Sequence, residues 1–106
     1  MRINLTDEEY ETLRRATEVF GYNMMLDILH EEMGELFVAI SQKHRARTHD
    51  FTNVKEEVGD CLVVLAQWAV WLGQFDIEEI STQKLKRLQA RIESNDFNLN
   101  TLISKK

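Results

Sequence analysis

Residues 31–35 read EEMGE and residues 56–60 read EEVGD, and these two acidic clusters organise the rest of the chain. Both lie in segments whose apolar residues recur every three to four positions, which is typical of helices. The second and last acids of each cluster are three residues apart, a spacing that directs two helical side chains to nearly the same point. The pattern therefore predicts two helices that carry carboxylates on facing sides.

A helical wheel of about 100° per residue separates these acids by their position on the apolar face. Glu32 lies inside the apolar arc of its segment, and Glu57 shares the apolar face of the second segment. Glu35 and Asp60 fall at the borders of these faces. The first acid of each cluster points further outward.

Carboxylates on a face that turns toward the core need a compensating partner. Desolvating one ion costs several kcal/mol, and two like charges about 4 Å apart repel by roughly 4 kcal/mol at an effective dielectric constant of about 20. A cation among them, or protonation of some of them, removes this cost. A set of oxygen ligands without His or Cys selects Mg²⁺ or Mn²⁺ over zinc. We predict that the metal ligands are Glu32, Glu35, Glu57 and Asp60; the alternative is that these acidic runs are solvated helix surface.

Length and composition indicate a small folded protein. A chain of 106 residues predicts a single domain over residues 1–106, and at this size a homo-oligomer is a natural way to bury more surface. A composition of 43% hydrophobic and 29% charged residues argues against disorder. The formal net charge of −5 disfavours direct nucleic-acid binding. It leaves a nucleotide substrate open, because a metal ion reverses the local charge.

The number of cysteines and the length of the apolar stretches indicate the cellular compartment. The lone cysteine, Cys61, lies on an apolar helix face and reads as a small buried hydrophobe in a reducing compartment. No apolar signal segment follows Met1, and the longest apolar stretch, residues 61–72, is too short to span a bilayer. We therefore expect a cytoplasmic protein without membrane association.

Cap residues divide the chain into helices. Thr6 and Glu9 form the first of three capping-box signatures, and Asn53 with Glu56 forms the second. Asp76 and Glu79 form the third, while Gly21 and Gly73 close periodic segments. We expect helices at residues 7–20, 23–44, 53–72 and 77–93, a loop at 44–52 and a tail at 94–106.

The expected architecture is an all-α, four-helix bundle-like fold that forms an oligomer. The helix over residues 53–72 is apolar around most of its circumference after Cys61, so it should be covered on more than one side. In so small a chain, a second copy is the expected cover. The tail, which carries Phe97, Leu99, Leu102 and Ile103, either docks on a partner subunit or stays loose.

Basic and aromatic residues are candidates for binding a substrate. Lys84, Arg87 and Arg91 share a helix side with apolar residues, where their heads could bind phosphate oxygens. The alternative is that their stems cover apolar surface while their heads reach water. Trp68 could stack on a nucleobase, although a tryptophan on an apolar helix is more often core. Arg45 and Arg47 in the loop are expected to be solvated, with contact to a triphosphate as the alternative. The three histidines are expected to be surface residues or residues with satisfied hydrogen bonds.

The whole pattern resembles the MazG-type all-α nucleoside triphosphate pyrophosphohydrolases. Their signature is EExxE followed at a distance by ExxD, and here Glu35 and Glu57 are separated by 21 residues. The stretches HEEMGELFVAI and EEVGDCLVVL resemble the two central helices of that family, and KLKRLQARIE resembles its basic last helix. The likeness covers roughly residues 23–93.

This resemblance implies a Mg²⁺-dependent enzyme that hydrolyses a (deoxy)nucleoside triphosphate to the monophosphate and pyrophosphate. It implies metal ligation by the same four acids, with Glu31 as an auxiliary residue at the rim and with Lys84 and Arg87 at the phosphates. It also implies that a second subunit completes the site, in a homodimer or a dimer of dimers. One departure is Leu88, which stands at a position that is basic in the family.

Three other functions compete with this one. A phosphoribosyl-ATP or dCTP pyrophosphohydrolase would belong to the same superfamily. A non-catalytic helical dimerisation module with an acidic face belongs to another class and would release no pyrophosphate. A di-iron carboxylate bundle is disfavoured, because the sequence contains no Glu-x-x-His pair.

Overall fold

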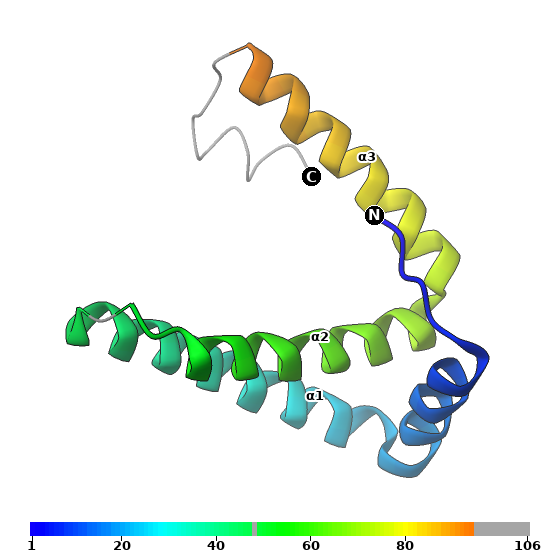
Figure 1. Ribbon diagram of the computed structural model, residues 1–106. Coiled ribbons are helices and arrows are strands. Elements are labelled where there is room, and N and C mark those ends of the chain that lie inside the picture. The colour runs from blue at the N-terminus through cyan, green and yellow to red at the C-terminus, as the bar shows by residue number, and fades with distance from the viewer. Residues whose placement is uncertain (48, 95–106) are drawn as a thin grey trace. The chain divides into compact units, whose positions relative to one another are not determined.

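The computed structural model describes residues 1–47 and 49–94, and its regular structure there is entirely helical (Figure 1). The helices are α1 (Asp7–Ala46), α2 (Thr52–Leu72) and α3 (Gln74–Glu93). The all-α class is confirmed, whereas the four-helix bundle and the oligomer stay predictions. The apolar tail residues named above lie outside the described residues.

The chain falls into two compact units. One comprises Leu5–Trp71, and the other comprises Met1–Asn4 together with the chain from Leu72 onward. The expectation of one domain over residues 1–106 stays a prediction. In the described ranges no single helix is long and apolar enough to cross a bilayer, and α2 and α3 meet that criterion only jointly, as a broken pair.

Helix α1 is interrupted at Gly21, where the backbone leaves helical geometry (φ 74°, ψ 169°). This combination is open essentially to glycine alone. The two predicted helices at 7–20 and 23–44 are therefore the two halves of α1. The predicted boundary at Gly21 is present as an interruption of the helical backbone. The capping box at the start is confirmed: Thr6 Oγ1 accepts from the Glu9 amide at 3.1 Å, and Glu9 Oε1 accepts from the Thr6 amide at 2.8 Å.

The connection between α1 and α2 is shorter than the expected loop at 44–52. Helix α1 continues to Ala46 and is ended by Arg47 in the left-handed conformation (φ 53°). The predicted Asn53 cap is wrong, because α2 already begins at Thr52. Instead, an Asp50 carboxylate oxygen accepts from the Thr52 amide at 3.0 Å and from its hydroxyl at 2.7 Å. Asp50 thus accepts hydrogen bonds from Thr52, one residue before the predicted cap at Asn53.

Helix α3 begins three residues earlier than the expected residue 77. The Asp76 capping box is wrong, because the N-cap is Gly73 and no side chain caps the helix. Gly73 takes a φ of 111°, and its carbonyl accepts from the Ile77 amide at 3.1 Å. Asp76 lies in the first turn of α3, where a negative charge favours the positive end of the helix dipole. One glycine is therefore the whole connection between α2 and α3.

Within the unit Leu5–Trp71, α2 runs antiparallel to the second half of α1 (Figure 1). The Cys61 thiol donates to the Glu32 carbonyl at 3.4 Å, and further along α2 the Trp71 ring lies 5.7 Å from the Tyr22 ring. As α2 advances, its partners on α1 move back toward the N-terminus, as in an antiparallel pair. The buried apolar side chains in this part of the chain are Met25, Ala39, Cys61, Val64 and Ala69.

Cys61 is buried, as expected for a small hydrophobe in the core. Burial raises the pKa of its thiol, and the neighbouring carboxylates, led by Glu32 and Glu57, raise it further. The thiol is therefore neutral at physiological pH and behaves as a packing group, not as a nucleophile.

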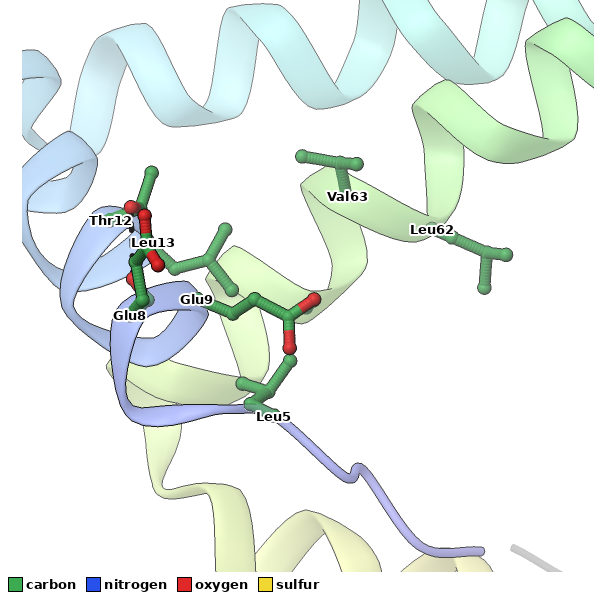
Figure 2. A pocket seen from close by; sticks show the side chains of 8 residues that line it. Leu5, Glu8, Glu9, Thr12, Leu13, Leu62 and Val63 are labelled. Carbon is green, nitrogen blue, oxygen red and sulfur yellow. Dashed lines mark hydrogen bonds between the residues drawn. The ribbon is translucent and has the colours of Figure 1, made fainter.

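A pocket of about 370 Å³ lies between the start of α1 and the middle of α2 (Figure 2). Leu5 and Leu13 line it from one side, and the exposed side chains of Leu62 and Val63 line it from α2. Helix α2 thus carries exposed apolar side chains in addition to those that pack against the second half of α1, as its sequence predicts.

In the other unit, the segment Met1–Asn4 is held on the first turns of α3 by hydrogen bonds. The Ile3 amide donates to Glu78 Oε1 at 2.7 Å, and the Gln74 side-chain amide donates to the Ile3 carbonyl at 2.6 Å. Gln74 and Glu78 both lie in the first turns of α3, directly after Gly73. The N-terminal segment therefore stabilises α3, although α1 follows it directly in sequence.

Candidate active site

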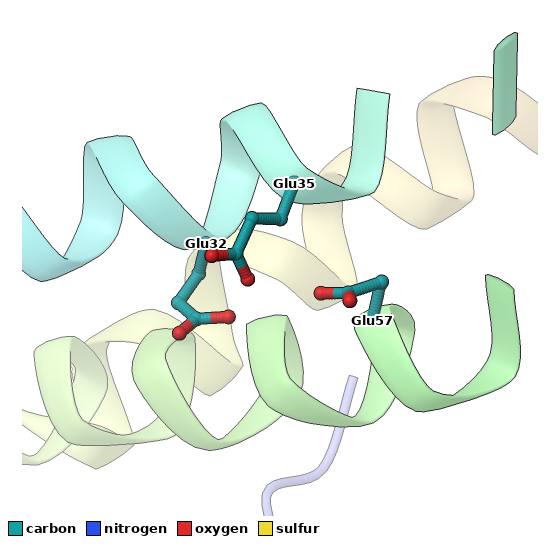
Figure 3. A group of neighbouring side chains, drawn as sticks. All are labelled: Glu32, Glu35 and Glu57. Atoms are coloured by element: carbon teal, nitrogen blue, oxygen red, sulfur yellow. The ribbon is translucent and has the colours of Figure 1, made fainter. Parts of the chain in front are cut away.

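Three glutamates converge between α1 and α2 (Figure 3). Helix α1 supplies Glu32 and Glu35, and α2 supplies Glu57; one carboxylate oxygen from each lies within 4.8 Å of the others. The spacing of three residues places the first two side chains on one side of α1, and the antiparallel packing brings Glu57 opposite them. The structure therefore brings together three of the four predicted metal ligands.

Asp60, the fourth predicted ligand, is exposed and lies outside this group of three. It follows Glu57 by one turn of α2, and its charge still acts on both Glu32 and Glu57. Glu31, the predicted auxiliary residue, is also exposed and lines a neighbouring pocket. Asp60 and Glu31 are thus at the periphery of the cluster.

The surroundings of Glu32 and Glu57 disfavour the charged forms of these two side chains. Burial is the largest cause that raises the pKa of Glu32, followed by the charges of Glu35 and Asp60. Burial also raises the pKa of Glu57, with further contributions from Glu35 and Asp60 and from a hydrogen bond with Glu35. No basic side chain is among the causes for either residue. Among the described residues, the cluster is a concentration of negative charge without a compensating cation.

Two oxygens of this cluster have unused hydrogen-bonding capacity. Glu32 Oε2 and Glu57 Oε2 are buried and have no hydrogen-bond partner among the described residues. A buried charged acceptor without a partner is unfavourable, because the energy lost on its removal from water is not recovered. A divalent cation would satisfy both oxygens and offset their repulsion, and the all-oxygen donor set suits Mg²⁺ or Mn²⁺. The residues present therefore fit such an ion.

A pocket of about 530 Å³ opens beside the cluster. Glu31, Glu35 and Glu57 contribute to its wall, so the carboxylates face a space within the 300–1,000 Å³ range of small-molecule sites. Three polar lining residues are missing from the set predicted from the sequence. They lie within about two turns of the acids on the same helices, so wider helical wheels would have found them: His30, Gln42 and Asn53.

The predicted phosphate-binding residues lie on α3, in the other compact unit. Lys84 and Arg87 are exposed, whereas Arg91 is only 6% exposed. The alternative reading, in which basic stems cover apolar surface while their heads reach water, therefore fits Lys84 and Arg87 better than Arg91, which is almost fully buried. Their role toward a substrate stays a prediction.

Trp68 belongs to an aromatic cluster with Tyr22 and Trp71. The Trp68 ring centroid lies 5.9 Å from that of Tyr22 and 5.6 Å from that of Trp71, both in edge-to-face arrangements. Its indole Nε1 is buried and has no hydrogen-bond partner in the described ranges. This packing favours the core interpretation, while stacking on a nucleobase stays a prediction.

Comparison with known protein families supplies the assignment that geometry alone does not. The model of the MazG nucleotide pyrophosphohydrolase domain matches residues 20–95, which is more than half of the chain. The chain belongs to the MazG family. The matched range begins at the break in α1 and includes the carboxylate cluster and all of α3. No curated protein and no solved structure matches this MazG domain.

Proposed function

We propose that this MazG domain hydrolyses a (deoxy)nucleoside triphosphate to the monophosphate and pyrophosphate in a reaction that depends on Mg²⁺. The observation that carries the proposal is the group of carboxylate oxygens from Glu32, Glu35 and Glu57, which lie within 4.8 Å of one another. Two of these residues also have a buried oxygen without a partner among the described residues. Such a site is unfavourable by itself and becomes favourable with a cation.

In this proposal, Glu32, Glu35 and Glu57 would hold the metal ion, with the exposed Asp60 as the fourth predicted ligand. When bound, Mg²⁺ lowers the pKa of a water molecule and neutralises charge that develops on the phosphoryl oxygens. A carboxylate outside the ligand set accepts the proton of the attacking water. Glu31, on the wall of the adjacent pocket, assists from the rim.

The pocket of about 530 Å³ supports binding of a small substrate beside the metal. Asn53 and Gln42 give its wall amide groups that can donate and accept hydrogen bonds, which is the chemistry that positions a sugar or a base. Lys84 and Arg87 are proposed to bind phosphate oxygens, and Trp68 is proposed to contact the base. Homodimerisation, or a dimer of dimers, and a cytoplasmic location are parts of the same proposal.

The test is pyrophosphate release measured across the standard and several damaged nucleoside triphosphates, with Mg²⁺, with Mn²⁺ and with EDTA. We expect release from at least one nucleotide that requires the metal. Phosphoribosyl-ATP and dCTP belong in the panel, since a strong preference for either would identify the corresponding related enzyme.

A non-catalytic dimerisation module is the outcome that would contradict the proposal. It would give no pyrophosphate with any nucleotide and no rise in melting temperature on addition of Mg²⁺. The thermal measurement separates the two parts of the proposal, because a stabilising metal without turnover would retain the metal site and reject the reaction.

A further inference from the structure

Each acidic cluster contains a glycine directly before its last acid. Gly34 precedes Glu35 on α1. Gly59 precedes Asp60 on α2. A glycine inside a helix costs stability relative to alanine, because it loses more backbone freedom when the chain folds. Each of these two glycines therefore calls for a cause: a special backbone conformation, close packing, or a ligand that lies against the backbone.

Neither backbone conformation nor packing explains Gly34. The interior of α1 departs from helical backbone angles at Gly21 and keeps them at Gly34, so any L-residue fits the backbone at this position. A Cβ built on Gly34 would meet no atom within 4 Å outside the local backbone. The same holds for Gly59. Within the described residues, the structure itself therefore does not require a glycine at Gly34.

The two glycines differ in their position relative to the pocket of about 530 Å³ beside the carboxylates. Gly34 lines this pocket, whereas Gly59 is not among its lining residues. One set of lining residues on α1 recurs at intervals of four, which places them in one row along the helix. This row consists of His30, Gly34, Val38 and Gln42. Gly34 is its only member without a side chain. We call the open space over this residue, between His30 and Val38, the Gly34 notch.

The Gly34 notch adjoins the carboxylates that would hold the metal ion. Glu35 follows Gly34 directly, and consecutive Cα atoms are about 3.8 Å apart. Glu57 lines the same pocket from α2. Both glutamates belong to the group of three in Figure 3. A nucleotide held there by its phosphates would therefore bring its sugar, which is esterified to the α-phosphate, to the neighbouring turn of α1.

The side chains on either side of the notch suit a sugar. Val38 is 53% exposed, so it offers apolar surface to the C–H groups of a sugar ring. His30 is exposed, and its imidazole nitrogens can donate a hydrogen bond to a hydroxyl or accept one from it. Between them, the bare backbone of α1 leaves room for a ring where a side chain would occupy the space. Apolar surface beside a few polar groups is typical of small-molecule sites.

We propose that the Gly34 notch receives the sugar of the nucleotide substrate, and that the glycine is present at a cost in stability because any side chain would fill this space. The inference rests on the proposed function, since the phosphates must bind at the carboxylates to bring the sugar to the notch. Natural proteins break the local rules of helix stability at functional sites. Gly34 thus positions the substrate and has no part in holding the metal ion.

Matched alanine substitutions separate stability from substrate binding. Gly34→Ala and Gly59→Ala each add one methyl group to a helical glycine with open space around it, so both should be at least as stable as the wild type in urea. Only Gly34→Ala should raise KM for the nucleotide, by at least about tenfold, because one extra carbon in a close-fitting pocket has an effect of this size. The value of kcat should change much less. Equal KM values for the two variants would overturn the proposal.

Ligands with and without a sugar test what occupies the notch. Inorganic tripolyphosphate has no sugar, so with Mg²⁺ it should bind the wild type, Gly34→Ala and Gly59→Ala alike in calorimetric titrations. The α,β-methylene analogues of the standard nucleoside triphosphates keep the sugar and resist hydrolysis at this bond. The analogue that binds the wild type most tightly should bind Gly34→Ala at least about tenfold more weakly and Gly59→Ala equally well. A similar loss for tripolyphosphate would assign Gly34 to the phosphates and overturn the proposal.

Failure of this proposal is distinguishable from failure of the proposed function. Pyrophosphate release with the same KM in the wild type and in Gly34→Ala would retain the hydrolysis and overturn the role of Gly34. Analogue binding that depends on Gly34, without pyrophosphate release from any nucleotide, would retain the notch and reject the hydrolysis. Neither analogue binding nor pyrophosphate release would overturn both. A sedimentation coefficient that changes only in Gly34→Ala would assign the glycine to a contact between copies and would also overturn the notch.

Discussion

At the scale of single residues, Glu32 and Glu57 combine two unfavourable features. Each has a buried oxygen without a hydrogen-bond partner in the described part of the chain, and each lies close to further carboxylates. Natural proteins retain such arrangements where a ligand compensates them. The cost to the metal-free protein and the capacity to bind a cation thus have the same origin.

Removing one of these charges should abolish catalysis without unfolding the protein. Glu32→Gln and Glu57→Gln keep the side-chain shape but lose a charged metal ligand, so we expect pyrophosphate release to fall at least about 100-fold. Helical content measured by circular dichroism should not change. Glu56→Gln on the outer side of α2 is the control and should retain most activity; full activity in both cluster variants would remove them from the site.

The raised pKa values of Glu32 and Glu57 predict how the metal-free stability depends on pH. A carboxyl whose pKa is higher in the folded protein binds more protons there than in the unfolded chain. Its contribution is complete below the unfolded pKa of about 4.5 and is lost as pH rises through the raised folded value. Glu9 and Asp50 have lowered pKa values and act in the opposite direction.

The test therefore compares how the stability of the wild type and of Glu32→Gln depends on pH. Denaturant unfolding in EDTA across about pH 4–8 should show that Glu32→Gln becomes increasingly more stable than the wild type as pH rises. Saturating Mg²⁺ should reverse this order near neutral pH, because only the wild type keeps its full set of ligands. Parallel pH profiles in EDTA would contradict the assigned electrostatics.

At the scale of elements, glycine conformations shape the helices more than side-chain caps do. The Thr6–Glu9 capping box is present as predicted, while α2 and α3 begin without the predicted caps at Asn53 and Asp76. Gly21 and Gly73 both have positive φ; Gly21 interrupts α1, and Gly73 separates α2 from α3. The fold therefore depends on two glycines that adopt backbone conformations which other residues rarely adopt.

Two alanine substitutions within α1 should have opposite effects on stability. Gly21→Ala forces an L-residue into a conformation that only glycine adopts readily, so we expect a loss of about 1–3 kcal/mol. Gly34→Ala replaces a helical glycine whose added Cβ would meet no atom within 4 Å, so a gain of up to about 1 kcal/mol is expected. Urea unfolding of both variants checks the signs, and a harmless Gly21→Ala would show that the break is not required.

At the scale of the whole molecule, much apolar surface stays exposed in a single chain. Large apolar side chains are exposed on every helix, Phe37 on α1, Leu62 on α2 and Phe75 on α3 among them. A chain of this size buries a limited fraction of its surface by itself. We therefore expect the proposed association to contribute to stability.

The melting temperature should consequently depend on protein concentration. Unfolding coupled to dissociation makes the midpoint rise with total concentration, so a hundredfold dilution should lower it measurably. A concentration-independent midpoint for the wild type would indicate a stable monomer.

The sequence by itself determined the all-α class, the break at Gly21, the Thr6 cap, the burial of Cys61 and the facing positions of Glu32, Glu35 and Glu57. These features depend on helical periodicity and on local backbone chemistry, which short stretches of sequence encode. Only the tertiary structure decided that Asp60 is exposed, that Asp50 replaces Asn53 at the start of α2, and that His30, Gln42 and Asn53 share a pocket wall with the acids. Those outcomes depend on the register between antiparallel helices and on competition among nearby donors and acceptors, which no single helix specifies.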